Sequence, residues 1–217
     1  MLGPLFMPPT PREEEPGGKL GTLVTPSSTG GANWNGAALD PESGRLYLPS
    51  VTGTYVADLQ PGHRGDLEFV PATRAFIEGP RGLPLLKPPY GRITAIDLNE
   101  GDIDWQVPNG DGPRLHPEIA HLNLPPLGRP GRGTPLATRT LLFVSEGDAI
   151  QVRTPPGGGG RMFRAYDKES GEVVWETELD AGTTGAAMTY MHEGKQYIVV
   201  AIGGRDHPAE FIALSLP

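Results

Sequence analysis

The chain has 217 residues, a net charge of −8 at pH 7 and no cysteine. The negative charge disfavours nucleic acid and anionic membrane surfaces as partners, and the lack of cysteine excludes disulfides, thiol catalysis and zinc–thiolate sites. Glycine (31 residues) and proline (25 residues) are abundant, yet 37% of the residues are hydrophobic. Many short strands joined by Gly/Pro-rich turns indicate an all-β protein.

Residues 1–19 are predicted to be a flexible N-terminal segment, because five prolines and the charged stretch Arg12–Glu15 favour an extended or disordered chain. The first residues lack the basic start and apolar run of a signal peptide. No stretch approaches the roughly 18 apolar residues of a membrane span. The folded part is expected to comprise residues 20–217.

The next stretches predict strands separated by long loops. Residues 21–25, 45–49 and 53–58 are expected to be strands, and a glycine-rich loop at 30–36 contains Asn33 and Trp34. Residues 60–90 and 108–133 form two Pro/Gly-rich insertions, and connections of this length are usually functional or mobile. His116 and His121 in the second insertion do not share a helical face, which disfavours a metal site there.

One pattern occurs twice in full and once in outline. Residues 95–105 and 165–175 both read Ala-x-Asp, three residues, Gly, three residues, Trp, whereas residues 38–48 end in Leu48. The Asp carboxylate can accept turn N–H bonds and the Gly can adopt positive φ, so each copy predicts a hairpin. A lone hairpin cannot bury a tryptophan, but stacked hairpins can. Trp105 and Trp175 are therefore predicted to be buried packing residues in a radial or linear repeat fold.

The rest of the chain adds strands and no clear chemistry. Strands at 140–144, 186–191, 196–201 and 211–214 bring the total to roughly a dozen, enough for about three four-stranded sheets. Residues 155–160 are expected to be a flexible loop. Ser145, Glu146 and Asp148 could line the mouth of a site, but a solvated turn is the preferred interpretation. The repeat accounts for the partial calcium-loop pattern at residues 97–101. No catalytic and no metal-binding residue is assigned.

The tandem repeat resembles the tryptophan-docking motif of quinoprotein β-propellers. Residues 30–34, leading into 40–44, resemble the Gly-x-Asn-Trp segment of pyrroloquinoline quinone (PQQ) dehydrogenases, and residues 182–204 resemble their C-terminal blade. Residues 90–98 and 109–113 are similar to the glucose-dehydrogenase-like branch. The resemblance covers nearly everything from residue 20 onward.

This resemblance implies an all-β fold, a partial β-propeller of about three four-stranded blades with long Pro/Gly-rich insertions. It implies PQQ contact for Asn33, through its amide, and for Trp34. The alternative is that Asn33 caps a turn and Trp34 is part of the blade core. The calcium ligands and the catalytic Asp of such enzymes lie in blades that precede this segment, so calcium is expected to be bound by regions absent from this chain. Some branches carry a Trp before the strand near Thr134, where this chain has residues 129–133 instead.

The implied function is the C-terminal portion of a periplasmic PQQ-dependent dehydrogenase that oxidises alcohols or sugars. The alternative is a non-catalytic β-propeller scaffold or binding module. An open arc of sheets leaves apolar faces and strand edges uncovered at both ends. Self-association, or completion by missing N-terminal blades, is therefore predicted.

Overall fold

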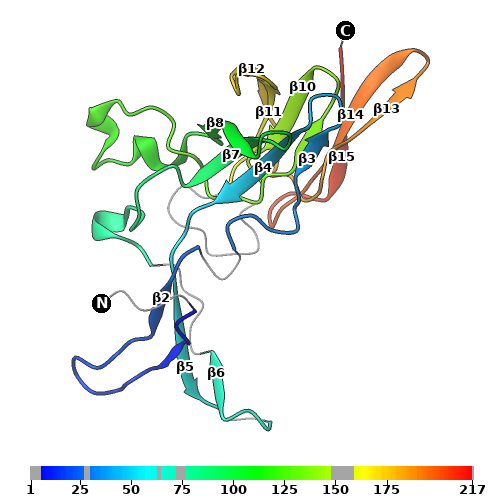
Figure 1. Ribbon diagram of the computed structural model, residues 1–217. Helices are drawn as coiled ribbons and strands as arrows, with labels where there is room; N and C mark the ends of the chain where they lie inside the picture. Colours follow the sequence, from blue (N-terminus) through cyan, green and yellow to red (C-terminus); the bar gives the residue numbers. More distant parts are fainter. Residues whose placement is uncertain (1–5, 27–29, 63–64, 72–76, 148–158, 217) are drawn as a thin grey trace.

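The computed structural model describes residues 6–26, 30–62, 65–71, 77–147 and 159–216 (Figure 1). Within these ranges the chain is nearly all β, with fifteen strands and three short 3-10 helices. The helices are η1 (Pro80–Gly82), η2 (Gly112–Leu115) and η3 (Ala120–Leu122). The strands are β1 (Thr10–Pro11), β2 (Thr22–Val24), β3 (Ala38–Asp40), β4 (Arg45–Val51), β5 (Tyr55–Pro61), β6 (Phe69–Pro71), β7 (Gly91–Asp97), β8 (Asp102–Pro108), β9 (Pro135–Ala137), β10 (Leu141–Ser145), β11 (Met162–Asp167), β12 (Val173–Glu178), β13 (Met188–His192), β14 (Lys195–Ile202) and β15 (Glu210–Ser215).

Three antiparallel sheets follow one another along the chain. Sheet 1 has the order β3-β4-β7-β8, sheet 2 the order β9-β10-β11-β12, and sheet 3 the order β13-β14-β15. These sheets are the blades of a partial β-propeller, as predicted. Two of them have four strands, and the third has three within the described residues.

Each sheet has one end with tight turns and one end with long connections. The turns β3–β4, β7–β8, β9–β10 and β11–β12 lie at one end, here called the turn end. The connections β4–β7, β8–β9 and β10–β11, together with the segments entering β3 and β13, lie at the opposite end, here called the loop end. Both long insertions predicted from sequence therefore emerge at the loop end.

The hydrophobic core lies between neighbouring sheets. One cluster joins Tyr47, Ile93 and Ala95 of sheet 1 to Leu142, Val144 and Tyr166 of sheet 2. A second cluster joins sheet 2 to sheet 3 and contains Phe143, Phe163, Ala165, Leu179, Ala181, Ala187, Val200 and Ile202. Stacking of one sheet on the next thus buries the faces that no single sheet could bury alone.

The two full repeat copies form the outer hairpins β7–β8 and β11–β12. Asp97 accepts hydrogen bonds from the amides of Asn99 (2.7 Å) and Glu100 (3.3 Å), and Asp167 accepts them from Glu169 (3.0 Å) and Ser170 (2.8 Å). These bonds hold the pKa of both exposed carboxyl groups below the usual value. The register shifts between Ala95 and Ile96 and between Ala165 and Tyr166, so the predicted bulged hairpin is confirmed in both copies.

Trp105 docks sheet 1 onto the β11–β12 turn of sheet 2. Its indole N–H donates to the Lys168 carbonyl oxygen at 3.1 Å, and the Tyr47 hydroxyl donates to the same oxygen at 3.2 Å. The ring lies so close to Gly171 that a Cβ atom there would be 2.8 Å from it. The prediction that Trp105 is a packing residue is confirmed.

Trp175 does not dock in the same way, and the prediction that it is buried is wrong. Its side chain is 42% exposed. The reason lies in sheet 3, which has no fourth strand among the described residues and so offers no turn equivalent to β11–β12. The outline copy at residues 38–48 also differs from the other two, because it forms the hairpin β3–β4 on the opposite side of sheet 1 from β7–β8.

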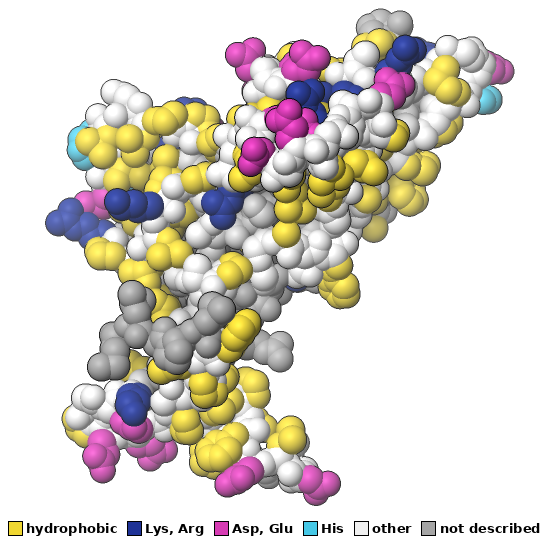
Figure 2. All heavy atoms as spheres, viewed as in Figure 1, with side chains coloured by type: hydrophobic (Ala, Val, Ile, Leu, Met, Phe, Trp, Pro, Cys, Tyr) yellow, Lys and Arg dark blue, Asp and Glu magenta, His cyan; other side chains and the backbone are white. Residues whose placement is uncertain are grey.

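A fourth, small sheet stands apart from the three blades (Figure 1). It has the order β1-β5-β2 with β6 beside β5. The N-terminal strands β1 and β2 therefore pair with residues 55–59 of β5, just before the first insertion, and β6 of that insertion pairs with the end of β5. Arg12 and buried Asp58 form an ion pair across it at 3.6 Å. Over this sheet, at the bottom of Figure 2, apolar and acidic side chains lie together on the surface. Whether residues 1–19 as a whole behave as a flexible segment remains a prediction, and residues 1–5 lie outside the described part.

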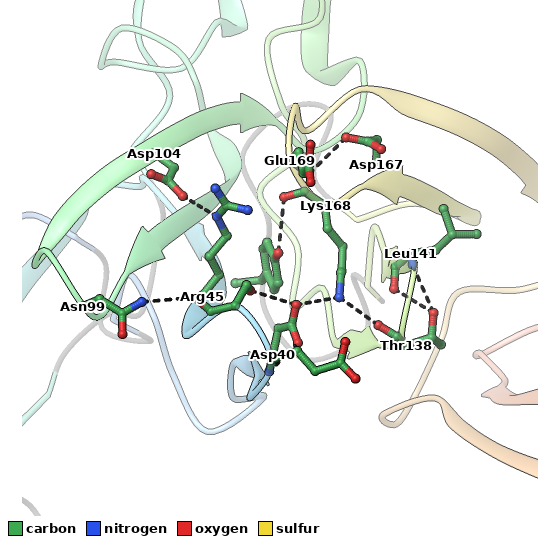
Figure 3. Close-up of polar contacts among 12 residues, drawn as sticks. Asp40, Arg45, Asn99, Asp104, Thr138, Leu141, Asp167, Lys168 and Glu169 are labelled. Carbon is green, nitrogen blue, oxygen red and sulfur yellow. Dashed lines mark hydrogen bonds and ion pairs between the residues drawn. The ribbon is translucent and has the colours of Figure 1, made fainter.

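A buried ion pair fastens sheets 1 and 2 together at the turn end (Figure 3). Lys168 Nζ donates to Asp40 Oδ2 at 2.6 Å and to the Thr138 carbonyl oxygen at 3.1 Å. The hydrogen bond from Lys168, helped by those from Ser43 and Glu42, lowers the pKa of Asp40 to about 2. Within sheet 1, Arg45, which lies opposite Asp40 in the register of β3 and β4, forms an ion pair with Asp104 of β8. The turn end is thus a structural junction.

Candidate functional site

The residues with candidate chemistry meet at the loop end, where the segments entering β3 and β9 run beside each other. Asn33, Trp34 and Asn35 precede β3, and Arg132 and Gly133 precede β9. The Asn35 side chain donates to the Gly133 carbonyl oxygen at 2.7 Å. This bond ties the two segments together although they are 98 residues apart in sequence.

Asn33 and Trp34, the two residues predicted to contact a cofactor, lie in an exposed turn. The Trp34 amide donates to Asn33 Oδ1 at 2.8 Å, and the Gly36 amide donates to the Asn33 carbonyl oxygen at 3.0 Å. The Trp34 side chain is 83% exposed. It is therefore not blade core in this chain, and its indole face is accessible at the loop end.

Arg132 faces Trp34 from the neighbouring segment. The guanidinium carbon lies 5.9 Å from the centre of the indole ring, a cation–π distance. An exposed aromatic face, a guanidinium and a side-chain amide therefore lie within one short stretch of surface. This donor set suits a planar ligand that carries negative charge.

An ionic network centred on buried Glu146 and Arg164 lies next to this surface. The Glu146 carboxylate accepts a bond from Arg164 Nη1 at 2.8 Å and lies 3.6 Å from Arg129 Nε, while Arg164 Nε donates to Glu176 at 2.8 Å. Burial alone would lower the pKa of Arg164, but its bonds to Glu146 and Glu176 raise it overall. Two arginines and two glutamates thus balance in charge.

The solvated-turn prediction for Ser145 and Glu146 is wrong, because Glu146 is only 2% exposed and Ser145 is buried as well. Arg129 comes from the second insertion and Arg164 from the next strand, so no local sequence signal could reveal the pairing. Asp148 and residues 155–158 lie outside the described part of the chain.

Asn109 and Tyr166 connect this network to the core between sheets 1 and 2. The Asn109 amide donates to the Ser145 carbonyl oxygen at 2.9 Å, and the Tyr166 hydroxyl donates to Asn109 Oδ1 at 3.3 Å. Burial raises the pKa of Tyr166 to about 12. Tyr166 therefore remains protonated near neutral pH and acts as a fixed donor that positions the start of the second insertion.

Metal-binding and membrane features can be assessed only over the described residues. Within them, no three His, Asp or Glu side chains come together in a way that could hold an ion. His116 lies between η2 and η3, and His121 lies within η3. None of the helices in these ranges is long and apolar enough to cross a bilayer.

Comparison with known proteins places this arrangement in a family. Residues 1–198 match the family described as the β-propeller domain of glucose, ethanol and alcohol dehydrogenases. A probable quinate dehydrogenase (quinone) of Xanthomonas campestris pv. juglandis is 29% identical over 90% of this chain and 27% of its own length. The quinoprotein glucose dehydrogenase of Escherichia coli K12 is 27% identical over 92% of this chain and 26% of its own.

Solved structures give the same fold. A quinohemoprotein alcohol dehydrogenase of Comamonas testosteroni superposes with a TM-score of 0.56 at 21% identity, covering 89% of this chain and 28% of that one. A europium-containing methanol dehydrogenase gives a TM-score of 0.55 at 21% identity, covering 83% and 26%. The chain spans about a quarter of the length of these proteins. It belongs to the PQQ-dependent dehydrogenase β-propeller family, of which it represents part of the propeller domain.

Proposed function

We propose that this chain is the C-terminal portion of the propeller of a PQQ-dependent dehydrogenase that oxidises alcohols or sugars, and that its loop end supplies part of the quinone site. The observation that carries the proposal is the convergence of Asn33, Trp34 and Arg132 at the loop end of a domain that matches this family over residues 1–198. Relatives are named for quinate, glucose and glycerol, so the substrate is proposed only as an alcohol or sugar.

The residues present fit such a cofactor in their chemistry. The exposed indole of Trp34 offers a flat apolar surface, and the amide of Asn33 can donate to a quinone oxygen or a carboxylate. PQQ, when bound, supplies an ortho-quinone that accepts a hydride from the alcohol carbon. The role proposed for this chain is to bind and orient that ring, not to remove the hydroxyl proton.

The ionic network below the surface supports this role. Glu146, Arg129 and Arg164 link the segment that precedes β9 to the segment that follows β10 and to β11 of sheet 2. Because the four charges balance, and Glu146 and Arg164 are buried, the network fixes the segment around Arg132 without competing for an anionic ligand. We propose that calcium and the catalytic base belong to regions outside this chain.

Two further proposals concern location and assembly. A periplasmic location is proposed from the family, and cell fractionation of a strain that expresses the natural gene tests it against a periplasmic marker enzyme. Self-association through the two uncovered end sheets, or completion by additional blades, is proposed from the exposure of their outer faces.

Titration with PQQ and calcium while following the melting temperature tests the main proposal. At about 100 times the dissociation constant, a ligand stabilises the folded state by about 2.7 kcal/mol, which raises the melting temperature of a chain of this size by about 5–10 °C. Asn33→Ala is expected to reduce the shift, whereas Asn99→Ala at the turn end is expected to retain it.

Absence of any shift up to millimolar PQQ would favour the alternative, a non-catalytic β-propeller scaffold. If PQQ raises the melting temperature of wild type and Asn33→Ala equally, the chain binds the cofactor but Asn33 does not contribute to the binding.

A further inference from the structure

The segment that carries Arg132 is held by close backbone packing against the end of β10. A Cβ atom on Gly131 would lie 2.0 Å from the Glu146 carbonyl oxygen, and one on Gly133 would lie 2.5 Å from the Ser145 carbonyl oxygen. A Cβ atom on Gly147 would lie 2.3 Å from the Arg132 carbonyl carbon. The backbone of residues 131–133 therefore packs directly against the backbone of residues 145–147. This leaves space for the Arg132 side chain on the side that faces Trp34.

Trp34 is fixed from the other direction. The Asn35 bond to Gly133 joins the two segments directly beside both side chains, and Asn33 Oδ1 accepts the Trp34 amide. The backbones of the two segments that enter β3 and β9 therefore hold Trp34 and Arg132 beside each other. Within the described residues, neither Trp105 nor Trp175 has an arginine at a comparable cation–π distance.

This arrangement differs from an ordinary surface stacking pair in its place and its accessibility. It lies at the loop end beside Asn33, and the indole remains 83% exposed although a guanidinium approaches it. A second planar group can therefore stack on the indole while the edge of the guanidinium offers N–H donors to a carboxylate. In a chain of net charge −8, a fixed arginine also offsets the general repulsion of an anion.

Resting on the proposed function, we propose that Arg132 and Trp34 form one binding element for the cofactor, in which the indole stacks on the ring system and the guanidinium pairs with a ring carboxylate. Arg132 is thereby a cofactor-binding residue within residues 129–133, the stretch that stands where some branches carry a tryptophan and for which the resemblance implies no contact in this chain. The pairing gives the site a preference for planar ligands that carry carboxylates over planar quinones that lack them.

Binding measurements with two ligands test this preference. PQQ and 1,10-phenanthroline-5,6-dione, a planar ortho-quinone without carboxylates, are titrated by calorimetry and by quenching of tryptophan fluorescence. Arg132→Gln is expected to weaken PQQ binding at least about tenfold, the loss of one charge-assisted contact, and to leave dione binding within about twofold. Arg132→Lys is expected to recover part of the PQQ affinity, because it keeps the charge without the planar fork.

Arg139→Gln is the matched control, since Arg139 is exposed in the β9–β10 turn at the opposite end of the same sheet. It is expected to bind both ligands like wild type. Trp34→Ala is expected to weaken both ligands. Circular dichroism melting of each variant checks that the fold is retained.

The outcomes separate this inference from the proposed function. Equal PQQ affinity of wild type and Arg132→Gln, with PQQ still bound, overturns the role of Arg132 and leaves the proposed function standing. Equal loss of PQQ and dione binding in Arg132→Gln overturns carboxylate recognition. No binding of PQQ to the wild-type chain overturns this inference and the proposed cofactor site together.

Discussion

At the scale of single residues, Asp40 and Lys168 form a buried ion pair between sheets 1 and 2. The folded-state pKa of Asp40 is about 2, below its usual value of 3.8. Its contribution to stability is therefore complete above about pH 4 and is lost as the pH falls toward 2. We expect the free energy of unfolding to fall by about 1–2 kcal/mol from this pair over that interval, as measured by urea denaturation at a series of pH values.

The double variant Asp40→Asn, Lys168→Met isolates this effect. It removes both charges without leaving one of them buried and alone, which would cost about 3–5 kcal/mol. The carboxyl groups of Asp97 and Asp167 also have lowered pKa values, but both are present in wild type and in the variant. The free energies of unfolding of wild type and of the double variant should therefore converge as the pH falls. Parallel profiles would show that the Asp40 carboxylate is not stabilised in the folded state.

Residue-level features of this kind were largely beyond prediction from sequence. Glu146 depends on Arg164, 18 positions later in the chain, and on Arg129 in an insertion, and Asp40 depends on Lys168, 128 positions away. Asn33 and Trp34 could be predicted as candidate site residues because they belong to the Gly-x-Asn-Trp segment. Arg132 could not be placed beside Trp34, because only the approach of β9 to β3 brings them together.

At the scale of elements, the outer hairpins could be predicted because their chemistry is local. Asp97 and Gly101, like Asp167 and Gly171, lie within five residues and hold the turn by bonds that they make themselves. The sequence of residues 38–48 could not show that this copy forms the first hairpin of its sheet, β3–β4, and not the second. The same turn sequence can join strands 1 and 2 or strands 3 and 4 of a blade. The exposure of Trp175 could not be predicted either, because it depends on sheet 3, which has only three strands in the part of the chain that the structure describes.

The two turn glycines offer a matched pair of substitutions. Gly101 and Gly171 both have positive φ, 81° and 73°, so alanine is strained at each to a similar extent. A Cβ atom on Gly101 meets open space, whereas one on Gly171 runs into the Trp105 ring. We expect Gly171→Ala to cost about 1–3 kcal/mol more than Gly101→Ala in urea denaturation, because it also displaces the docked indole.

Repeating both substitutions in a Trp105→Ala background completes the cycle. With the ring removed, the two alanines are expected to cost the same within about 0.5 kcal/mol. A difference that persists without the tryptophan would mean that the extra cost arises from something other than docking.

At the scale of the whole molecule, the same sheets that bury one face leave the other face uncovered at each end of the arc. On sheet 1, Ala38, Tyr47, Ala95 and Trp105 pair across the strands and face sheet 2. The neighbouring row on the opposite face is Leu39, Leu46, Ile96 and Ile103, and Ile103 is 61% exposed. Sheet 3 likewise presents Met188 and a stacked Tyr190–Tyr197 pair on its outer face.

These two end faces are different surfaces, so a contact that joins one to the other is head to tail and does not close by a two-fold axis. Stacking of blade on blade is already how sheets 1 and 2, and sheets 2 and 3, are joined within the chain. We therefore expect concentration-dependent association of the wild-type chain in analytical ultracentrifugation. Ile103→Glu on sheet 1 and Tyr190→Glu on sheet 3 should each abolish it, because each places a charge in one half of the contact.

A mixture of the two variants gives the sharpest result. The Ile103→Glu copy keeps an intact sheet 3 face and the Tyr190→Glu copy keeps an intact sheet 1 face, so the pair should form a one-to-one dimer and nothing larger. Each variant alone should sediment as a monomer, and a charge-neutral control such as Asn99→Ala at the turn end should associate like wild type. A wild-type chain that remains monomeric at every concentration would instead mean that its end faces do not recognise each other, and that only sheets absent from this chain cover them.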